Sequence, residues 1–257
     1  MQVIILKNAD EIGQYAADII LSGVTDGSIS VLGVATGSSP LPVYRALESR
    51  WVPQVAELTA FALDEYVGLA PEHPESYHSV IDREVTRPLR LDPARVHVPN
   101  GAAEDPERAC VDYERAIAEA GGVDLQILGI GSTGHIGFNE PSSSLSSRTR
   151  IKTLTPETRR DNARFFPSLD DVPLHCVTQG LGTIMDARRV LLVAQGEGKA
   201  RAVAQAVEGP LSSMCPGSVL QLHPDATILL DEEAASRLTL TDYYRFVFEN
   251  RPAWQRP

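Results

Sequence analysis

Short apolar runs alternate with helix-like segments along nearly the whole of this 257-residue chain. The strand-like runs lie at 3–6, 29–35, 58–64, 95–98, 124–130, 189–194 and 226–231. Helix-like segments lie at 9–22, from Pro40 onwards, and near 76–87, 105–120 and 198–207. This alternation is typical of a mostly parallel sheet with helices on both faces. We predict one doubly wound α/β domain spanning residues 1–257.

Polar residues follow three of the predicted strands. They are Thr36-Gly37-Ser38-Ser39, the pair Asp64-Glu65, and a loop that carries His135 and Glu140. In an open α/β sheet, ligands bind at the carboxyl ends of the strands. We therefore expect these three segments to converge on one site.

The segment Thr36–Ser39 links a strand to a helix. Its small residues expose backbone N–H groups, and a helix amino terminus favours an anion. The segment lacks the lysine of a P-loop, which argues against a triphosphate. A purely structural alternative is that Ser38 or Ser39 caps the following helix.

The loop after residue 130 contains GIGSTG, which matches the glycine pattern of dinucleotide-binding proteins. That motif requires a helix to begin within it and an acidic residue about 20 positions later. Here Pro141 and three serines follow at once, and the region near 150 is basic. The loop is therefore interpreted as a support for His135 rather than as a nucleotide site.

His135 and the two carboxylates Asp64 and Glu140 are the candidate acid–base groups. A neutral imidazole can exchange a proton with a sugar oxygen near pH 7, and a carboxylate often orients such a histidine. A partly desolvated Asp64 could remove a proton from carbon next to a carbonyl or imine. The structural alternatives are a histidine bonded to loop backbone and an aspartate that caps a turn.

Composition excludes several classes of function. The net charge of −11 argues against nucleic acid or an anionic membrane as partner, and no apolar run is long enough to span a bilayer. Three distant cysteines without a C-x-x-C or H-E-x-x-H motif argue against a zinc site and favour a reducing, cytoplasmic location. An anionic substrate would need local positive charge, for which Arg164 and Lys199 are candidates.

Several motifs together resemble the glucosamine-6-phosphate deaminase family. They are LGVATGSSPLPVY at 32–44, LDEYVGLAPEHPESY at 63–77, GHIGFNEPSSSLSSRTRIKTL at 134–154, NARFF at 162–166, GEGKARAVAQAVEG at 196–209 and LQLHPDATILLDEEAAS at 220–236. The resemblance covers nearly the whole chain in order, and GHIGFNEP is its most specific part.

The resemblance implies that D-glucosamine 6-phosphate and water give D-fructose 6-phosphate and ammonia. Asp64 matches the base that moves a proton between C2 and C1, His135 the ring-opening acid–base, and Glu140 its supporting carboxylate. The phosphate-binding residues by resemblance are Thr36, Gly37, Ser38, Ser39, Arg164 and Lys199. No metal or cofactor is implied, because the amino sugar itself supplies the imine.

One residue departs from the family pattern. The family usually has aspartate, or sometimes asparagine, two positions before the histidine, whereas this chain has Thr133. Threonine can form hydrogen bonds but cannot stabilise an imidazolium by charge. Three interpretations stay open: a deaminase, a relative with weak activity or another amino-sugar phosphate as substrate, and a non-catalytic sugar-phosphate sensor.

The resemblance also suggests regulation. Ser143, Arg150, Lys152 and Thr153 match positions that bind the activator N-acetylglucosamine 6-phosphate between subunits in hexameric family members. Arg150 and Lys152 are two apart on a predicted extended segment, so both can face one side and share a phosphate. The alternative is a pair of solvated basic residues at a strand edge. A homo-oligomer with an effector site is the resulting hypothesis.

Overall fold

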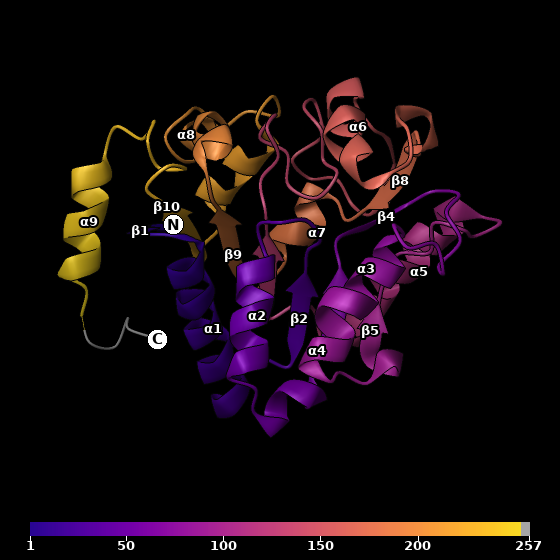
Figure 1. The fold of residues 1–257 in the computed structure, drawn as a ribbon, viewed down its shortest axis with the longest axis horizontal. Coiled ribbons are helices and arrows are strands. Elements are labelled where there is room, and N and C mark those ends of the chain that lie inside the picture. The colour runs from indigo at the N-terminus through magenta and orange to yellow at the C-terminus, as the bar shows by residue number, and fades with distance from the viewer. Residues whose placement is uncertain (253–257) are drawn as a thin grey trace.

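The computed structural model describes residues 1–252 and contains a parallel sheet with the strand order β1-β10-β9-β6-β2-β3-β5 (Figure 1). Each of its neighbouring pairs is parallel. The strands are β1 Gln2–Leu6, β2 Val31–Val34, β3 Thr59–Ala62, β5 Val96–His97, β6 Leu125–Leu128, β9 Arg189–Ala194 and β10 Ala226–Asp231. The prediction of a mostly parallel α/β sheet is confirmed.

Alternate side chains of the strands enter two separate cores. In β9, Leu191 and Val193 pack on one face, whereas Val190 and Leu192 pack on the other. Each core contains residues of the helices that cover its face. Because both faces are covered, the strands consist of continuous apolar runs, as expected for a parallel sheet.

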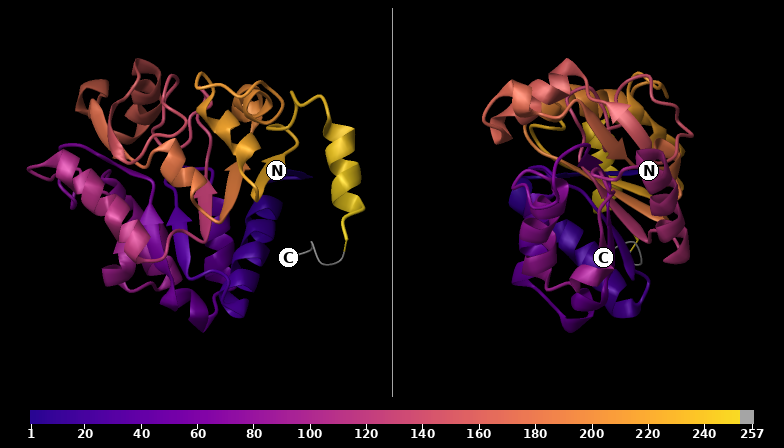
Figure 2. Two further views of the ribbon diagram at one scale, coloured as in Figure 1. Left: turned by 180° about the vertical axis from the view of Figure 1, so that it is seen from behind. Right: turned by 90° about the vertical axis from the view of Figure 1, so that its right-hand side faces the viewer.

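Helices α1, α2 and the segment from α3 to α4 cover one face, and α5, α7 and α8 cover the other (Figure 2). Capping defines several helix ends: Asn8 accepts a hydrogen bond from Glu11 N at the start of α1, and Gly27 ends it with φ of 79°. The helices are α1 Ala9–Asp26, α2 Leu41–Ser49, α3 Tyr77–Ile81, α4 Arg87–Leu89, α5 Pro106–Glu119, α6 Pro156–Asn162, α7 Leu181–Met185, α8 Ala200–Val207 and α9 Thr241–Glu249.

A second, antiparallel sheet lies over the carboxyl ends of the main strands and was not expected from the sequence. It consists of β4 Asp64–Tyr66, β8 His175–Thr178 and β7 Arg150–Thr153, in the order β4-β8-β7. The apolar run at 58–64 is therefore two strands, because β3 ends at Ala62 and the chain then enters the second sheet. Helix α9 was also not expected, since the predicted series ended at residue 231.

Four adjacent strands, β9, β6, β2 and β3, occupy the centre of the main sheet. Their carboxyl ends lead to the segments at 195–199, 129–135, 35–39 and 63–64. The predicted convergence of polar segments at one edge therefore has a direct cause in the strand order. Among the helices of residues 1–252, none combines the length and the apolar composition that spanning a bilayer requires.

Candidate active site

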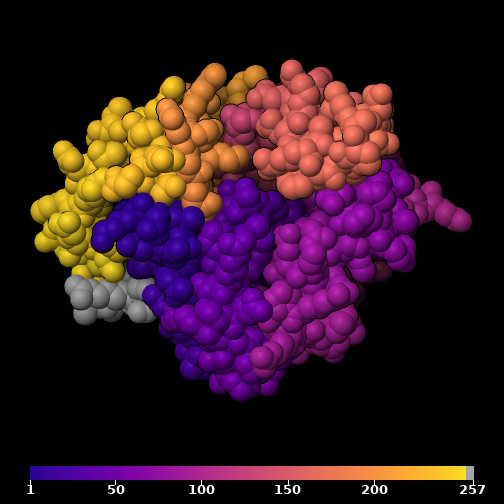
Figure 3. Space-filling view, viewed as in Figure 1, coloured from indigo at the N-terminus to yellow at the C-terminus, as the bar shows by residue number. Residues whose placement is uncertain are grey.

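A cleft of about 490 Å³ opens at the carboxyl ends of the central strands. In the space-filling view it is visible as a hollow between the orange segment of α8 and the salmon segment of α6 (Figure 3). Residues from both sequence halves line it, and they include Thr36, Gly37, Ser38, Ser39, Asp64, Tyr66, Tyr77, Gly131, His135, Phe138, Asp161, Arg164 and Lys199. The structure thus brings together six residues of the three polar segments, Thr36–Ser39, Asp64 and His135, with the two candidate cations Arg164 and Lys199.

The segment Thr36–Ser39 forms the turn between β2 and α2. Gly37 has φ of 94°, a left-handed conformation that glycine adopts without strain. Helix α2 begins after Pro40 and receives no side-chain cap, so the alternative that Ser38 or Ser39 caps it is wrong. Ser38 is exposed next to the amino terminus of a helix, where an anion is favoured, whereas the hydroxyl of the half-buried Thr36 contacts the phenol of Tyr77.

The two predicted basic residues line the same cleft, as does Arg83. Lys199 follows β9 and is half-buried; burial and the nearby Arg164 lower its pKa, and Asp161 opposes that shift. Arg164 is exposed and lies over the ring of Phe165, with its guanidinium carbon 4.7 Å from the ring centroid. In a chain of net charge −11, the two cations give this cleft the local positive charge that an anionic ligand requires.

Asp64 is the buried acid of the cleft, with 6% of its surface exposed. Burial, and after it the charge of the neighbouring Glu65, raise its pKa to about 8 against the opposing effect of a hydrogen bond from the Phe138 backbone. Glu65 accepts hydrogen bonds from the backbone N–H groups of Tyr66, Tyr77 and His78 at 2.7–2.9 Å. These bonds fix β4 to the start of α3, so Glu65 positions Asp64 and does not itself line the cleft.

His135 lies on the glycine-rich loop after β6, and its ring packs against Gly131. A Cβ atom at Gly131 would overlap the Cε1 and Nε2 atoms of the imidazole, so only glycine allows the ring this close to the backbone. The loop closes on itself through a hydrogen bond of 2.9 Å from Gly131 N to His135 O. Nε2 has no hydrogen-bond partner in residues 1–252 and is free to meet a ligand in the cleft.

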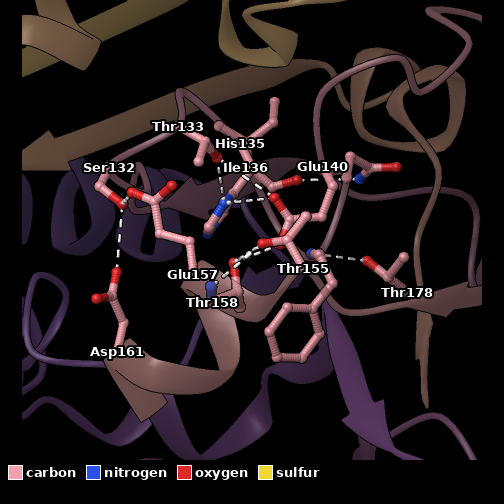
Figure 4. A network of polar contacts seen from close by, with 12 residues as sticks. Ser132, Thr133, His135, Ile136, Glu140, Thr155, Glu157, Thr158, Asp161 and Thr178 are labelled. Atoms are coloured by element: carbon pink, nitrogen blue, oxygen red, sulfur yellow. Dashed lines mark hydrogen bonds and ion pairs between the residues drawn. The ribbon is translucent and has the colours of Figure 1, made fainter. Parts of the chain in front are cut away.

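Glu140 lies behind His135, away from the cleft, and is 3% exposed. Its Oε2 atom is 3.3 Å from His135 Nδ1 and accepts a hydrogen bond of 3.3 Å from Thr133 (Figure 4). Its Oε1 atom accepts hydrogen bonds from the hydroxyls of Thr155, at 3.1 Å, and of Thr158. Although burial opposes ionisation, His135 and the two threonines lower the pKa of Glu140 to about 2, so it is a carboxylate at any working pH.

The predicted effector residues lie outside this cleft. Ser143 is buried in the loop after Glu140, and its hydroxyl has no partner in residues 1–252. Arg150, Lys152 and Thr153 lie on β7, at the edge of the second sheet. Arg150 and Lys152 are the more buried residues of that strand and share one face, as their spacing predicted.

Sequence reasoning missed several residues of the cleft. The phenol oxygen of Tyr66 accepts a hydrogen bond of 2.8 Å from Asn162 of α6, and its ring packs against those of Tyr77 and Phe138. Tyr77 also faces the cleft, and burial raises the pKa of both tyrosines. The one available signal was the position of Tyr66 in the run Asp64-Glu65-Tyr66, where alternation puts residues 64 and 66 on the same face.

Two further features complete the description of possible sites. A hollow of about 670 Å³ lies between α9 and the β1 edge of the sheet, but none of the predicted site residues lines it. In residues 1–252, no group of three or more His, Cys, Asp or Glu side chains is arranged to hold a metal ion. The chemistry-bearing side chains gather in the cleft.

The chain is similar to known proteins of one family. The sequence profile of the family described as glucosamine-6-phosphate isomerases/6-phosphogluconolactonase matches residues 7–229. The chain belongs to this family. It is 58% identical to a glucosamine-6-phosphate deaminase of Pseudarthrobacter chlorophenolicus over 257 residues, and 56% identical to one of Mycolicibacterium smegmatis over 259 residues. Each alignment covers 99% of both chains.

Solved structures of the isomerase/lactonase family fall into two groups. A structure described as a monomeric glucosamine-6-phosphate deaminase superposes with a TM-score of 0.89 at 41% identity, covering 92% of this chain and 100% of that chain. A 6-phosphogluconolactonase from Trypanosoma brucei superposes with a TM-score of 0.76 at 18% identity, covering 93% and 98%. The second likeness shows a shared fold only.

The raised pKa of Asp64 predicts a particular dependence of stability on pH. Between about pH 4 and 8 the folded protein keeps a proton on Asp64 that the unfolded chain releases, so stability falls as pH rises. The wild type should lose up to about 1.4 kcal/mol per pH unit relative to Asp64→Asn across this range. Urea unfolding of both proteins at pH 5, 6, 7 and 8 measures the difference, and a difference that is constant with pH would contradict the assignment.

Proposed function

We propose that this protein is a glucosamine-6-phosphate deaminase, converting D-glucosamine 6-phosphate and water to D-fructose 6-phosphate and ammonia. The observation that carries the proposal is the single cleft in which Asp64 and His135 meet the cations Lys199 and Arg164. A phosphosugar needs both kinds of group, one to bind its phosphate and the other to move its protons. Full-length relatives at 52–58% identity that bear this name support it.

The phosphate is assigned to Thr36–Ser39, Lys199 and Arg164. Backbone N–H groups and hydroxyls of the turn would bind the phosphate oxygens at the amino terminus of α2, and the two side chains would neutralise its charge. This anchors one end of the sugar and leaves C1 and C2 for the acid–base groups. Binding at the far end of the substrate holds the reacting carbons in place.

His135 is assigned the opening of the pyranose ring. His135 lines the cleft and its Nδ1 contacts Thr133 and Glu140, which leaves Nε2 as the ring nitrogen for the substrate. Nε2 would take the proton of the C1 hydroxyl as the C1–O5 bond breaks, and a proton returned to O5 completes the open chain. The product of this step carries an aldehyde at C1 and the amine at C2.

Asp64 is assigned the proton transfer between carbons. It would remove the C2 proton while the C1 carbonyl oxygen accepts the electron pair and a proton, which gives an enolamine. Return of a proton to C1 yields an imine at C2, which water hydrolyses to the ketone and ammonia. Its pKa of about 8 makes Asp64 a stronger base than an exposed carboxylate, although at pH 7 only about a tenth of the free enzyme has it ionised.

Ammonia release tests the proposal directly. Purified protein is incubated with D-glucosamine 6-phosphate, and with mannosamine 6-phosphate to test the open question of substrate preference. Asp64→Asn should reduce turnover by about 10²- to 10⁴-fold and abolish solvent deuterium uptake at C2. Asp242→Asn, an exposed change in α9, is the matched control. Binding of the sugar phosphate without ammonia release by the wild type would favour a sensor instead.

Substitution of the two cations tests the phosphate assignment separately. Arg164→Ala and Lys199→Ala should each raise KM by about 10- to 100-fold with a smaller effect on kcat, because a charge-assisted hydrogen bond contributes about 1.5–3 kcal/mol. Lys7→Ala, an exposed lysine before α1, controls for loss of positive charge. If both cleft variants keep the wild-type KM, the phosphate binds elsewhere.

A second part of the proposal is an effector site for N-acetylglucosamine 6-phosphate in a homo-oligomer. Ser143 has an unpartnered buried hydroxyl, and one terminal nitrogen of the half-buried Arg150 has no partner in residues 1–252. Burial lowers the pKa of Arg150, as expected for a cation that awaits a counter-charge. In the second sheet, Thr178 of β8 pairs with Arg150 of β7 on one side and with Asp64 of β4 on the other. One row of paired residues therefore runs from the proposed effector site to the active-site cleft.

Kinetics and sedimentation together test this second part. The effector should increase the apparent affinity for substrate, Arg150→Ala should remove that response, and the protein should sediment as an oligomer. Arg108→Ala on the exposed face of α5 is the control. Hyperbolic kinetics that N-acetylglucosamine 6-phosphate leaves unchanged, from a protein that sediments as a monomer, would contradict it; the structural relative at 41% identity is itself described as monomeric.

The location proposed for the reaction is the cytoplasm. Cys110, Cys176 and Cys215 are buried free thiols, which a reducing compartment preserves.

A further inference from the structure

The Nδ1 atom of His135 contacts two groups at once. Thr133 Oγ1 is 2.9 Å away, and Glu140 Oε2 is 3.3 Å away. The Thr133 hydroxyl is also 3.3 Å from the same carboxylate oxygen, so the three groups form a closed triangle (Figure 4). Within this triangle the hydroxyl makes the shorter contact with the imidazole.

The protons of the triangle have one consistent arrangement. Glu140, with a pKa of about 2, is ionised and can only accept hydrogen bonds. The single hydrogen of the Thr133 hydroxyl is therefore directed to Glu140, and its oxygen lone pair faces Nδ1. A lone pair at that position requires that Nδ1 carry the hydrogen, which leaves an unprotonated Nε2 in the cleft.

We propose that Thr133 is a positioning residue that fixes the tautomer and the orientation of the His135 imidazole. This inference rests on the proposed function, in which Nε2 opens the sugar ring. Thr133 does not line the cleft and so acts through His135 rather than on the substrate. The hydroxyl transmits the orienting effect of Glu140 to Nδ1 without adding a second negative charge.

Two other sets of contacts help the Thr133 hydroxyl to hold the His135 ring in one orientation. Gly131 holds the opposite side of the ring, because a Cβ there would overlap Cε1 and Nε2. Glu140 is itself held by Thr155 and Thr158, which occupy its other oxygen. The ring is therefore confined between backbone on one side and a fixed acceptor on the other. Thr133 links the imidazole ring to this acceptor, Glu140. Loss of its hydroxyl should let the ring turn without unfolding the loop.

The absence of charge on Thr133 has a functional consequence. A carboxylate next to Nδ1 would favour the imidazolium form, which cannot accept a proton at Nε2. A hydroxyl can orient the ring without adding to the negative charge that Glu140 already places 3.3 Å from Nδ1. The enzyme should therefore keep a ring-opening base at more acidic pH than the same enzyme with aspartate at this position.

Three substitutions separate these roles. Thr133→Val keeps the shape and removes the hydroxyl, and should lower kcat for glucosamine 6-phosphate by about 10- to 100-fold with little change in KM. Thr133→Ser keeps the hydroxyl and should stay within a few-fold of the wild type. Thr133→Asp should move the acidic limb of the kcat/KM–pH profile to higher pH. Thr25→Val in α1 is the control for the loss of a hydroxyl far from the cleft.

A spectroscopic measurement tests the tautomer without any turnover. Nitrogen-15 NMR of the imidazole, assigned with His135→Gln, should show the hydrogen on Nδ1 in the wild type and a mixture of tautomers in Thr133→Val. Wild-type kcat or an unchanged tautomer in Thr133→Val would overturn the inference, as would an equal loss of kcat in Thr133→Ser. If the wild type releases no ammonia, the proposed function fails, whereas the nitrogen-15 spectra still decide the role of Thr133.

Discussion

Burial of the Asp64 carboxyl is the constraint on which the site depends. A carboxylate strong enough to take a proton from carbon must be shielded from water, and shielding one charge costs free energy that the surrounding fold must supply. The second sheet provides this shield. It draws β4, β7 and β8 from three distant parts of the chain over the ends of the main strands, so the base exists only when the whole fold is complete.

The two acid–base groups have opposite environments. Asp64 is buried next to Glu65, and burial together with that neighbouring charge raises its pKa to about 8. Glu140 lies among His135 and threonine hydroxyls, which lower its pKa to about 2. Asp64 in the cleft and Glu140 behind His135 can therefore differ in role, the first as a base and the second as a permanent counter-charge for the imidazole. Environment rather than residue type determines which is which.

The main sheet could be predicted because its strands are continuous apolar runs. Such runs are stable only when they are buried on both faces of a sheet. The second sheet could not be predicted: an extended segment was expected at Arg150 and Lys152, but the sequences RIKT of β7 and DEY of β4 do not indicate which strand they pair with. Such short, polar strands carry no apolar pattern and are specified only by pairing with β8. The same limit explains α9, whose side chains are not buried and which follows the last predicted strand.

The candidate site residues were found where polar side chains directly follow strands, as with Thr36, Asp64 and His135. Their supports were missed, because Thr155 and Thr158 lie 15 and 18 residues after Glu140 in the chain, beyond strand β7. Gly131 belongs to the GIGSTG run that was interpreted as a support for His135, but its close contact with the imidazole ring is a property of the folded loop. Sequence position indicates which residues reach the cleft, whereas the partners that determine their protonation follow from tertiary contacts.

The central claim is that the fold keeps Asp64 protonated near neutral pH and makes it a base above that. Infrared difference spectra between the wild type and Asp64→Asn isolate the carboxyl band of this one residue. The account predicts a protonated C=O band at pH 6 that is replaced by carboxylate bands with a midpoint near pH 8. A carboxylate signal already complete at pH 6 would contradict it.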